Sequence, residues 1–224
     1  MEDAFELLAD QPLEIDEQKL DPQLRNRSGE TLIDDRWVTL LRRPSRMILR
    51  KRPARSLAAP PDSDPDRRFL DVAFLCSLQS FPEHRFRWSR LQIDLSPTRS
   101  AMIRDMMPLS IRGEEPVELK TSVTLEATFL SLALKPEIAT SRTVYYPQIA
   151  GTGVGTRIAS WDFLAFGNEY LHSNRELRLL IDAPINSLLL ARLTFEAKVT
   201  LSGLAGEIPL LARIGTIDQT YRLD

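Results

Sequence analysis

The chain has 224 residues, of which 43% are hydrophobic and 27% charged, and its formal net charge is −2. This composition is typical of a globular protein, and it lacks the strong positive charge of a dedicated nucleic-acid binder. The longest apolar runs, such as residues 188–191, fall far short of the roughly 20 residues that a membrane-spanning helix needs. We therefore expect a globular protein rather than an integral helical membrane protein.

Residues 1–35 carry eleven acidic residues against three basic ones. Their one amphipathic piece, residues 4–9, is long enough for a turn or two of helix, which is unstable unless it docks on another surface. We interpret residues 1–35 as an acidic flexible arm, acting either as a docking peptide or as a terminus that contacts nothing. The first residues are acidic where a secretory signal is basic, so we expect a cytoplasmic protein.

The charge then reverses, and seven basic residues follow within 14 positions without an acidic one. They are Arg42, Arg43, Arg46, Arg50, Lys51, Arg52 and Arg55. Two short apolar runs, residues 37–41 and 47–49, flank a turn that contains Pro44, which predicts a basic β-hairpin. Residues 58–66 are rich in proline and aspartate and predict a linker. Residues 36–68 thus form the second expected unit, with a domain boundary near residue 68.

From Phe69 to the end of the chain, apolar and polar residues alternate with a period of two. The pattern is clearest over residues 117–129 and 191–201, which predict half-buried strands. Weaker strands are predicted at residues 71–78, 85–95, 102–111, 143–149, 156–166, 176–182, 210–214 and 220–223. Many short strands without a long helix predict an all-β fold, an antiparallel two-sheet β-sandwich over residues 69–224.

Two of these strands change phase part-way. Phe86 and Trp88 share one face, which we expect to be the core, but the next apolar set begins at Leu91, so we expect a bulge near Ser89 and Arg90. A second change of phase follows Phe129. Together with the basic hairpin, the arginines of the first strand suggest a basic binding patch; these are Arg85, Arg87 and Arg90.

The sequence contains no catalytic, cofactor or metal motif that we recognise. Its two histidines, His84 and His172, stand alone in segments that we expect to be loops, and no G-x-S-x-G elbow surrounds a serine. The single cysteine, Cys76, lies in an apolar run and is interpreted as a small buried side chain. No catalytic residue, cofactor or metal ligand is therefore predicted, and the pattern favours a non-enzymatic role over an enzyme with a carboxylate site.

Two further features favour a structural interpretation over a ligand site. The glycine-rich run 151–155 leads into a predicted strand rather than a helix, so we expect it to permit close backbone approach rather than to cradle a phosphate. Asp162 stands between Trp161 and Phe163; we expect the two aromatic side chains in the core and Asp162 facing outward.

These observations lead us to expect a protein-binding or scaffold module of an intracellular complex, using the charged arm and the edges of the sandwich. One alternative is a nucleic-acid-associated protein that uses the basic segment 42–55. Another is a membrane-active β protein whose long alternating strands rearrange at a bilayer. The expected partner is a protein, with nucleic acid as the alternative.

Overall fold

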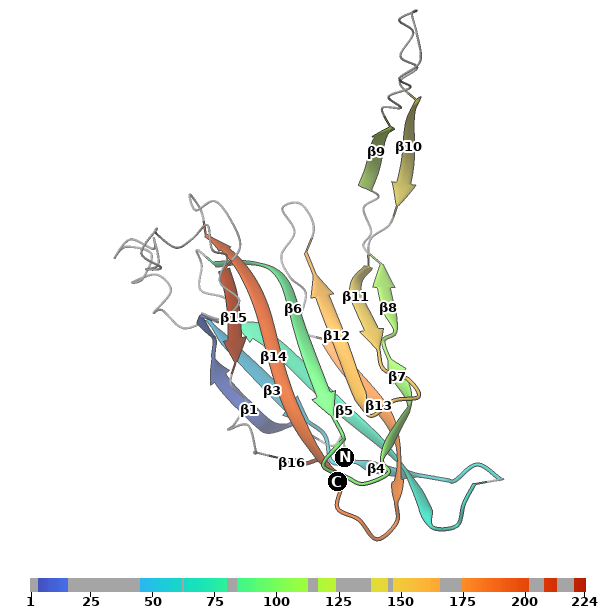
Figure 1. Cartoon of the computed structure of the whole chain (residues 1–224). Coiled ribbons are helices and arrows are strands. Elements are labelled where there is room, and N and C mark those ends of the chain that lie inside the picture. The colour runs from blue at the N-terminus through green and yellow to red at the C-terminus, as the bar shows by residue number, and fades with distance from the viewer. Residues whose placement is uncertain are drawn as a thin grey trace, which may run out of the picture.

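The computed structural model describes residues 4–15, 45–61, 63–79, 84–112, 117–123, 138–144, 147–165, 175–201, 208–212 and 220–224. All regular structure in these ranges is β-strand, arranged as two packed antiparallel sheets and a separate pair of strands (Figure 1). The expected fold class, an antiparallel β-sandwich, is confirmed. Within the described residues, no helix has the length and hydropathy of a bilayer-spanning segment.

Sheet A is built around two long central strands, β5 and β13, which pair along ten residues. Its order is β1-β3-β5-β13-β7, and β4 pairs with β5 on the same side as β3, nearer to the start of β5. The strands are β1 (Glu6–Pro12), β3 (Arg46–Lys51), β4 (Arg55–Leu57), β5 (Arg67–Gln79), β7 (Met102–Met107) and β13 (Arg175–Pro184).

Sheet B is centred on β6, which pairs with β14 on one side and β12 on the other. Its order is β2-β15-β14-β6-β12-β11-β8, with β16 pairing to the start of β14. The strands are β2 (Glu14–Ile15), β6 (His84–Asp94), β8 (Ser110–Arg112), β11 (Pro147–Thr152), β12 (Ile158–Leu164), β14 (Leu190–Leu201), β15 (Ile208–Ala212) and β16 (Tyr221–Arg222).

The core lies between the two sheets and is filled by alternate residues of their strands. Phe74 of sheet A and Trp161, Phe163 and Phe195 of sheet B are fully buried in one cluster. Burying a side chain of this size stabilises the fold by about 1.5–3 kcal/mol. Cys76 is also fully buried in this cluster, as expected. The predicted inward positions of Trp161 and Phe163 are confirmed.

The N-terminal part of the chain departs from the expected layout. Residues 6–12, expected in a flexible arm with a turn of helix, form β1 and pair with β3. β3 in turn pairs with β5, so the basic segment is an internal strand of sheet A rather than half of a separate hairpin. The physical reason is that Met47 and Leu49 of β3 are fully buried in the core. Residues 37–41, the expected hairpin partner, and the remainder of the arm from residue 16 lie outside the described residues.

A bulge in β6 accounts for the expected change of phase. Lys198 is opposite Trp88 and Val199 is opposite Phe86, so Arg87 has no opposing residue on β14. The bulge therefore lies close to the expected position. It also reverses the face of Trp88, which we expected in the core together with Phe86. Phe86 is buried, whereas Trp88 is half-buried on the outer face. His84, expected in a loop, is the first residue of β6, and the second change of phase near residue 129 is outside the described residues.

Candidate functional site

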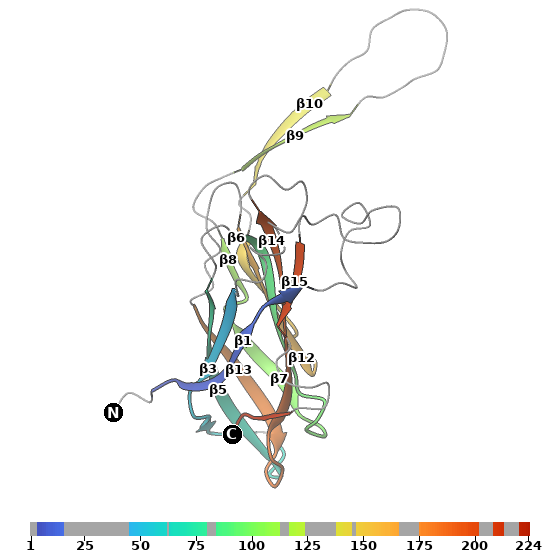
Figure 2. The same cartoon turned by 90° about the vertical axis from the view of Figure 1, so that its left-hand side faces the viewer.

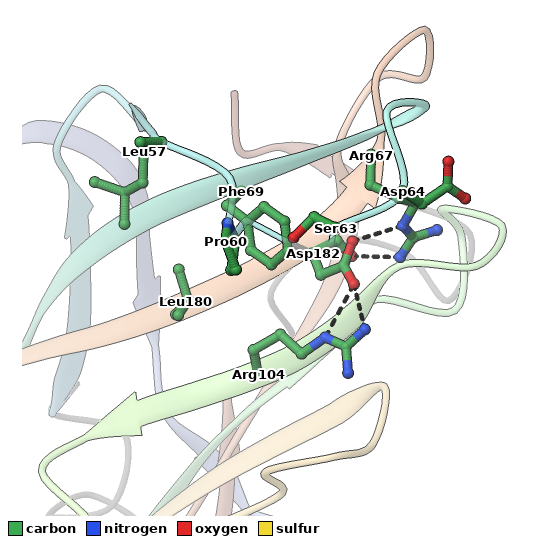
Figure 3. Close-up of a pocket in the computed structure, with 10 residues that line it drawn as sticks. Leu57, Pro60, Ser63, Asp64, Arg67, Phe69, Arg104, Leu180 and Asp182 are labelled. Atoms are coloured by element: carbon green, nitrogen blue, oxygen red, sulfur yellow. Dashed lines mark hydrogen bonds and ion pairs between the residues drawn. The ribbon is translucent and has the colours of Figure 1, made fainter.

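The outer face of sheet A carries a groove of about 650 Å³. Phe69 of β5 and Leu180 of β13 form its apolar floor, and Arg104 of β7 lies along one side (Figure 3). The other side is lined by residues of the segment 58–66, which we expected to be a linker: Ala58, Pro60, Ser63 and Asp64. The expected linker is therefore a wall of the groove.

Hydrogen bonds within this wall explain why it has a defined shape. The backbone N–H of Ser63 donates to the carbonyl of Pro60, and the backbone N–H of Asp66 donates to the Asp64 carboxylate. The N–H of Ile185 then donates to the carbonyl of Asp66, which ties the segment to the turn after β13. Aspartate and proline favour such turns, and here the turn packs beside the sheet.

One buried carboxylate, that of Asp182, organises the charged end of the groove. Its side chain is 2% exposed and accepts hydrogen bonds from Arg67 Nε at 2.6 Å and from Arg104 Nε at 2.9 Å and Nη2 at 2.5 Å. Burial opposes ionisation of this carboxyl, but the hydrogen bonds from Arg67 and Arg104 outweigh it and lower the pKa of Asp182. Two guanidinium groups thus meet one carboxylate (Figure 3).

The basic residues expected to bind a partner are divided between the two sheets. Arg46, Arg50, Lys51, Arg52 and Arg55 lie in or beside β3 and β4 of sheet A. Arg46 pairs with Asp10 at 2.9 Å, and Arg52 pairs with Glu176 at 3.1 Å. Arg42 and Arg43 lie outside the described residues.

The other three expected residues, Arg85, Arg87 and Arg90, lie on β6 of sheet B. Because β3 and β6 belong to opposing sheets, the structure does not bring the two arginine groups onto one surface. Arg90 is bound to Asp162 through two hydrogen bonds of 2.8 Å. The placement of these residues therefore adds no support to the nucleic-acid alternative.

Trp88 is the centre of a charged cluster on the outer face of sheet B. Its indole N–H donates to Asp162 at 3.0 Å, and the Arg90 guanidinium and the Lys198 ammonium lie 5.4 and 5.9 Å from the ring centroid. Both distances fall within the range of cation–π attraction. Asp162 faces outward, as expected; cross-strand pairing places Arg90 directly opposite it, and Trp88, opposite Leu164, is its diagonal neighbour.

The glycine-rich run closes the turn between β11 and β12 and touches β7 and the segment that follows it. A Cβ on Gly151 would lie 2.7 Å from the carbonyl oxygen of Pro108, which accepts a hydrogen bond from the Trp161 indole at 3.1 Å. Gly153 and Gly155 have φ values of +125° and +79°. The run therefore permits close approach of the backbone, as expected.

β9 (Val117–Val123) and β10 (Ile138–Val144) form a two-stranded ribbon, which we call the β9–β10 ribbon. They pair along seven residues, from Val117 opposite Val144 to Val123 opposite Ile138. Neither pairs with another strand in the described ranges, and both extend away from the sandwich in two perpendicular views (Figures 1 and 2). At its base, β8 and β11 pair within sheet B, with Arg112 opposite Pro147.

Comparison with known proteins assigns no family. No family model and no curated protein matches the chain. Among solved structures, the NetB toxin of Clostridium perfringens in its membrane-inserted form is similar, with 8% identity over 80% of this chain and 87% of that chain. Its TM-score is 0.32, and this likeness assigns neither a fold family nor a function.

Sequence reasoning missed the three residues that form the charged end of the groove, Arg67, Arg104 and Asp182. Asp182 is the last residue of the predicted strand 176–182 and precedes Ala183 and Pro184, a combination that is typical of a turn. Its burial follows from pairing of β13 with both β5 and β7, which places one arginine on each side. The only signal in the sequence is that Asp182 continues the outward phase of Arg178 and Leu180.

Among the described residues, no group of three or more histidine, cysteine, aspartate or glutamate side chains is placed to hold a metal ion.

Proposed function

We propose that this protein is a protein-binding module of an intracellular complex and that the β9–β10 ribbon engages the partner. The observation that carries this proposal is the pairing of the ribbon: within the described residues, each of its strands has one neighbour only. A strand with one neighbour leaves half of its backbone N–H and C=O groups available for another strand. A partner polypeptide that adds a strand would complete this hydrogen bonding.

The stability of the ribbon supports the same proposal. An isolated two-stranded hairpin is marginally stable in water, because it has no further strand or sheet against which to bury a face. The ribbon leaves sheet B at a point where β8 and β11 already pair with each other. The sandwich thus does not need the ribbon for its own closure, which favours a role in contacts outside the chain.

This arrangement permits a clean test. Residues 113–146 are replaced by an Asn-Gly turn between Arg112 and Pro147, since these two residues are opposite each other in the sheet. A second variant carries a Gly/Ser segment of the same length, which preserves reach but does not favour a strand. We expect proteins that crosslink to the full chain in its native host to be lost with both variants. Retention of the same proteins by either variant, with the sandwich folded, would reject the proposal.

A second candidate function, membrane activity, is favoured by the two unlike faces of the ribbon. By register, one face holds valine, isoleucine, leucine and threonine positions together with Arg142, and the other holds charged, serine, threonine and alanine positions. The first face comprises Val117, Leu119, Thr121, Val123, Ile138, Thr140, Arg142 and Val144; the second comprises Glu118, Lys120, Ser122, Ala139, Ser141 and Thr143. Strands with one apolar and one polar face are suited to a boundary between lipid and water.

Release of a trapped dye from phosphatidylcholine and phosphatidylglycerol vesicles tests this candidate. We expect the full chain to release the dye and the variant with the Asn-Gly turn to release none. Absence of release by the full chain over a wide range of protein-to-lipid ratios would exclude membrane activity and leave the protein-binding proposal unaffected.

A further inference from the structure

The groove on the outer face of sheet A has the size and lining of a small-molecule site. Its volume, about 650 Å³, lies within the range of such sites in proteins. The floor is apolar, and the polar groups gather at one end, where Arg67, Arg104 and Asp182 meet (Figure 3). A ligand that fits this division has one apolar part and one charged end.

The charge at that end indicates the sign of the ligand. Arg67 is largely enclosed, with 19% of its side chain exposed, and it also donates to the backbone carbonyls of Asp182 at 3.2 Å and Ser100 at 2.9 Å. Arg104 is 51% exposed and contacts Asp182 through Nε and Nη2. Asp182 contacts both guanidinium groups and its one negative charge is shared between them, so the exposed Arg104 retains positive charge toward the groove. Figure 3 shows the Asp64 carboxylate directed away from Asp182.

The guanidinium of Arg104 is also held in place before any ligand arrives. Two of its nitrogens contact the same Asp182 oxygen, so the planar group has a fixed direction. A fixed guanidinium is well suited to carboxylate and phosphate groups, which it can bind with two parallel hydrogen bonds. The apolar floor beside it, formed by Phe69 and Leu180, then contributes hydrophobic contact with the rest of the ligand.

We infer that the groove binds a small anionic amphiphile, with its carboxylate or phosphate on Arg104 and its apolar chain along Phe69 and Leu180. This inference is independent of the function proposed for the ribbon, because the groove and the β9–β10 ribbon share no residue. A carboxylate and a phosphate both meet the requirement of the groove, which is a negative group within reach of the Arg104 guanidinium.

Isothermal titration calorimetry with the full chain tests the inference. Decanoate and decyl phosphate serve as probes, decanol as the probe without charge, and inorganic phosphate as the probe without an apolar chain. The variant Arg104→Gln removes the charge, and Leu180→Glu places a negative charge on the floor. Arg178→Gln is the matched control, because Arg178 lies on the same face of β13 but pairs with Asp71 and does not line the groove.

We expect saturable binding of at least one anionic probe, weakened about tenfold or more in Arg104→Gln and Leu180→Glu and unchanged in Arg178→Gln. The better of the two anionic probes identifies the preferred headgroup. The inference is overturned if neither anionic amphiphile binds the wild-type chain, or if both groove variants bind these probes as the wild type does. It is also overturned if decanol or inorganic phosphate binds as tightly as decanoate and decyl phosphate.

Discussion

Trp88 and Asp162 are joined by a hydrogen bond of 3.0 Å between neighbouring strands of sheet B, with the indole nitrogen as the donor. Asp162 accepts two more hydrogen bonds from Arg90, whose guanidinium also lies near the Trp88 ring. One carboxylate thus holds both a charged and an aromatic side chain against the outer face of the sheet. The three residues act as a unit that stabilises the pairing of β6 with β12.

Replacing Asp162 by alanine removes the acceptor from both Trp88 and Arg90. Because hydrogen bonds to a charged group are stronger than neutral ones, we expect a loss of about 2 kcal/mol in the free energy of unfolding. Urea denaturation followed by circular dichroism measures this loss. Ser160→Ala, two residues earlier on the same strand, is the control and should cost much less. Equal losses would show that the cluster adds no stability.

The ion pairs of Asp182 predict a dependence of stability on pH. Burial raises the pKa of the Asp182 carboxyl, but the hydrogen bonds from Arg67 and Arg104 lower it by more than burial raises it. The pKa in the folded protein therefore lies below the ordinary value of 3.8. The stabilisation is therefore complete at neutral pH, above the unfolded pKa, and is lost as the pH falls below about 4 through the folded pKa.

Urea unfolding at a series of pH values between 7 and 3 tests this dependence. We expect the wild-type free energy of unfolding to fall more steeply below pH 4 than that of Asp182→Asn, whose side chain does not titrate. Part of the slope should remain in the variant, because the pKa of Asp224, which burial raises, is lowered overall by hydrogen bonds from Arg68 and Arg222. Identical slopes would show that Asp182 is not ion-paired in solution.

The two glycines at the β11–β12 turn differ in the space around them and make a matched pair of substitutions. A Cβ on Gly153 would lie 2.1 Å from the backbone oxygen of Ile158, whereas one on Gly155 has nothing within 4 Å. Both have positive φ, so each alanine variant carries backbone strain of about 1–2 kcal/mol. We expect Gly153→Ala to cost clearly more than Gly155→Ala in thermal unfolding, and equal costs would contradict the turn geometry.

Truncation at the expected domain boundary should destroy the sandwich. A chain that begins at Phe69 lacks β1, β2, β3, β4 and the first two residues of β5, and with β3 it loses the buried side chains of Met47 and Leu49. Each of these side chains stabilises the core by about 1.5–3 kcal/mol. We expect residues 69–224 to bind a hydrophobic dye and to unfold without a cooperative transition, whereas residues 4–224 unfold cooperatively. A cooperative transition in the shorter chain would place the boundary at residue 68 after all.

Cys76 provides a thiol that reports on opening of the core. Burial raises its pKa to about 12, so little thiolate forms at pH 8 in the folded protein. We expect an aromatic disulfide reagent to leave the native thiol unmodified over hours and to react within minutes in concentrated urea. Rapid reaction of the native protein would show that β3, β5 and β13 separate readily, because Cys76 lies opposite Leu49 and Arg175 on its two neighbours.

Features set by local alternation could be predicted, and features set by contacts distant in the sequence could not. The alternation of β14 and the inward position of Trp161 follow from residue types that are neighbours along the chain. β1 was missed because its acidic residues dominate the pattern and its strand form depends on β3, some 40 residues away. The outward position of Trp88 depends on a bulge at Arg87, two residues from the expected place, and a shift of one residue reverses the face.

The candidate groove could not be predicted from the sequence for the same reason. The Arg67–Asp182 pair joins residues 115 positions apart, and neither residue has a local pattern that names its partner. The basic residues from 42 to 55 and from 85 to 90 formed the more conspicuous signal, yet the topology places the described members of the two groups, those from 46 to 55 and from 85 to 90, in different sheets. Charge along the chain predicts a surface only where the strand order is known.

The position of β13 in sheet A has a consequence for the synthesis of this protein. β13 is the strand that joins β5 to β7, and it lies in the last quarter of the chain. While the ribosome is still translating the preceding residues, β5 carries an unpaired edge next to its apolar face. The positive charge of Arg67 then has no Asp182 carboxylate to pair with. Strand pairing over such separations is slow and exposes the growing chain to aggregation. The nascent protein is therefore expected to need chaperone protection until residues 175–184 have left the exit tunnel.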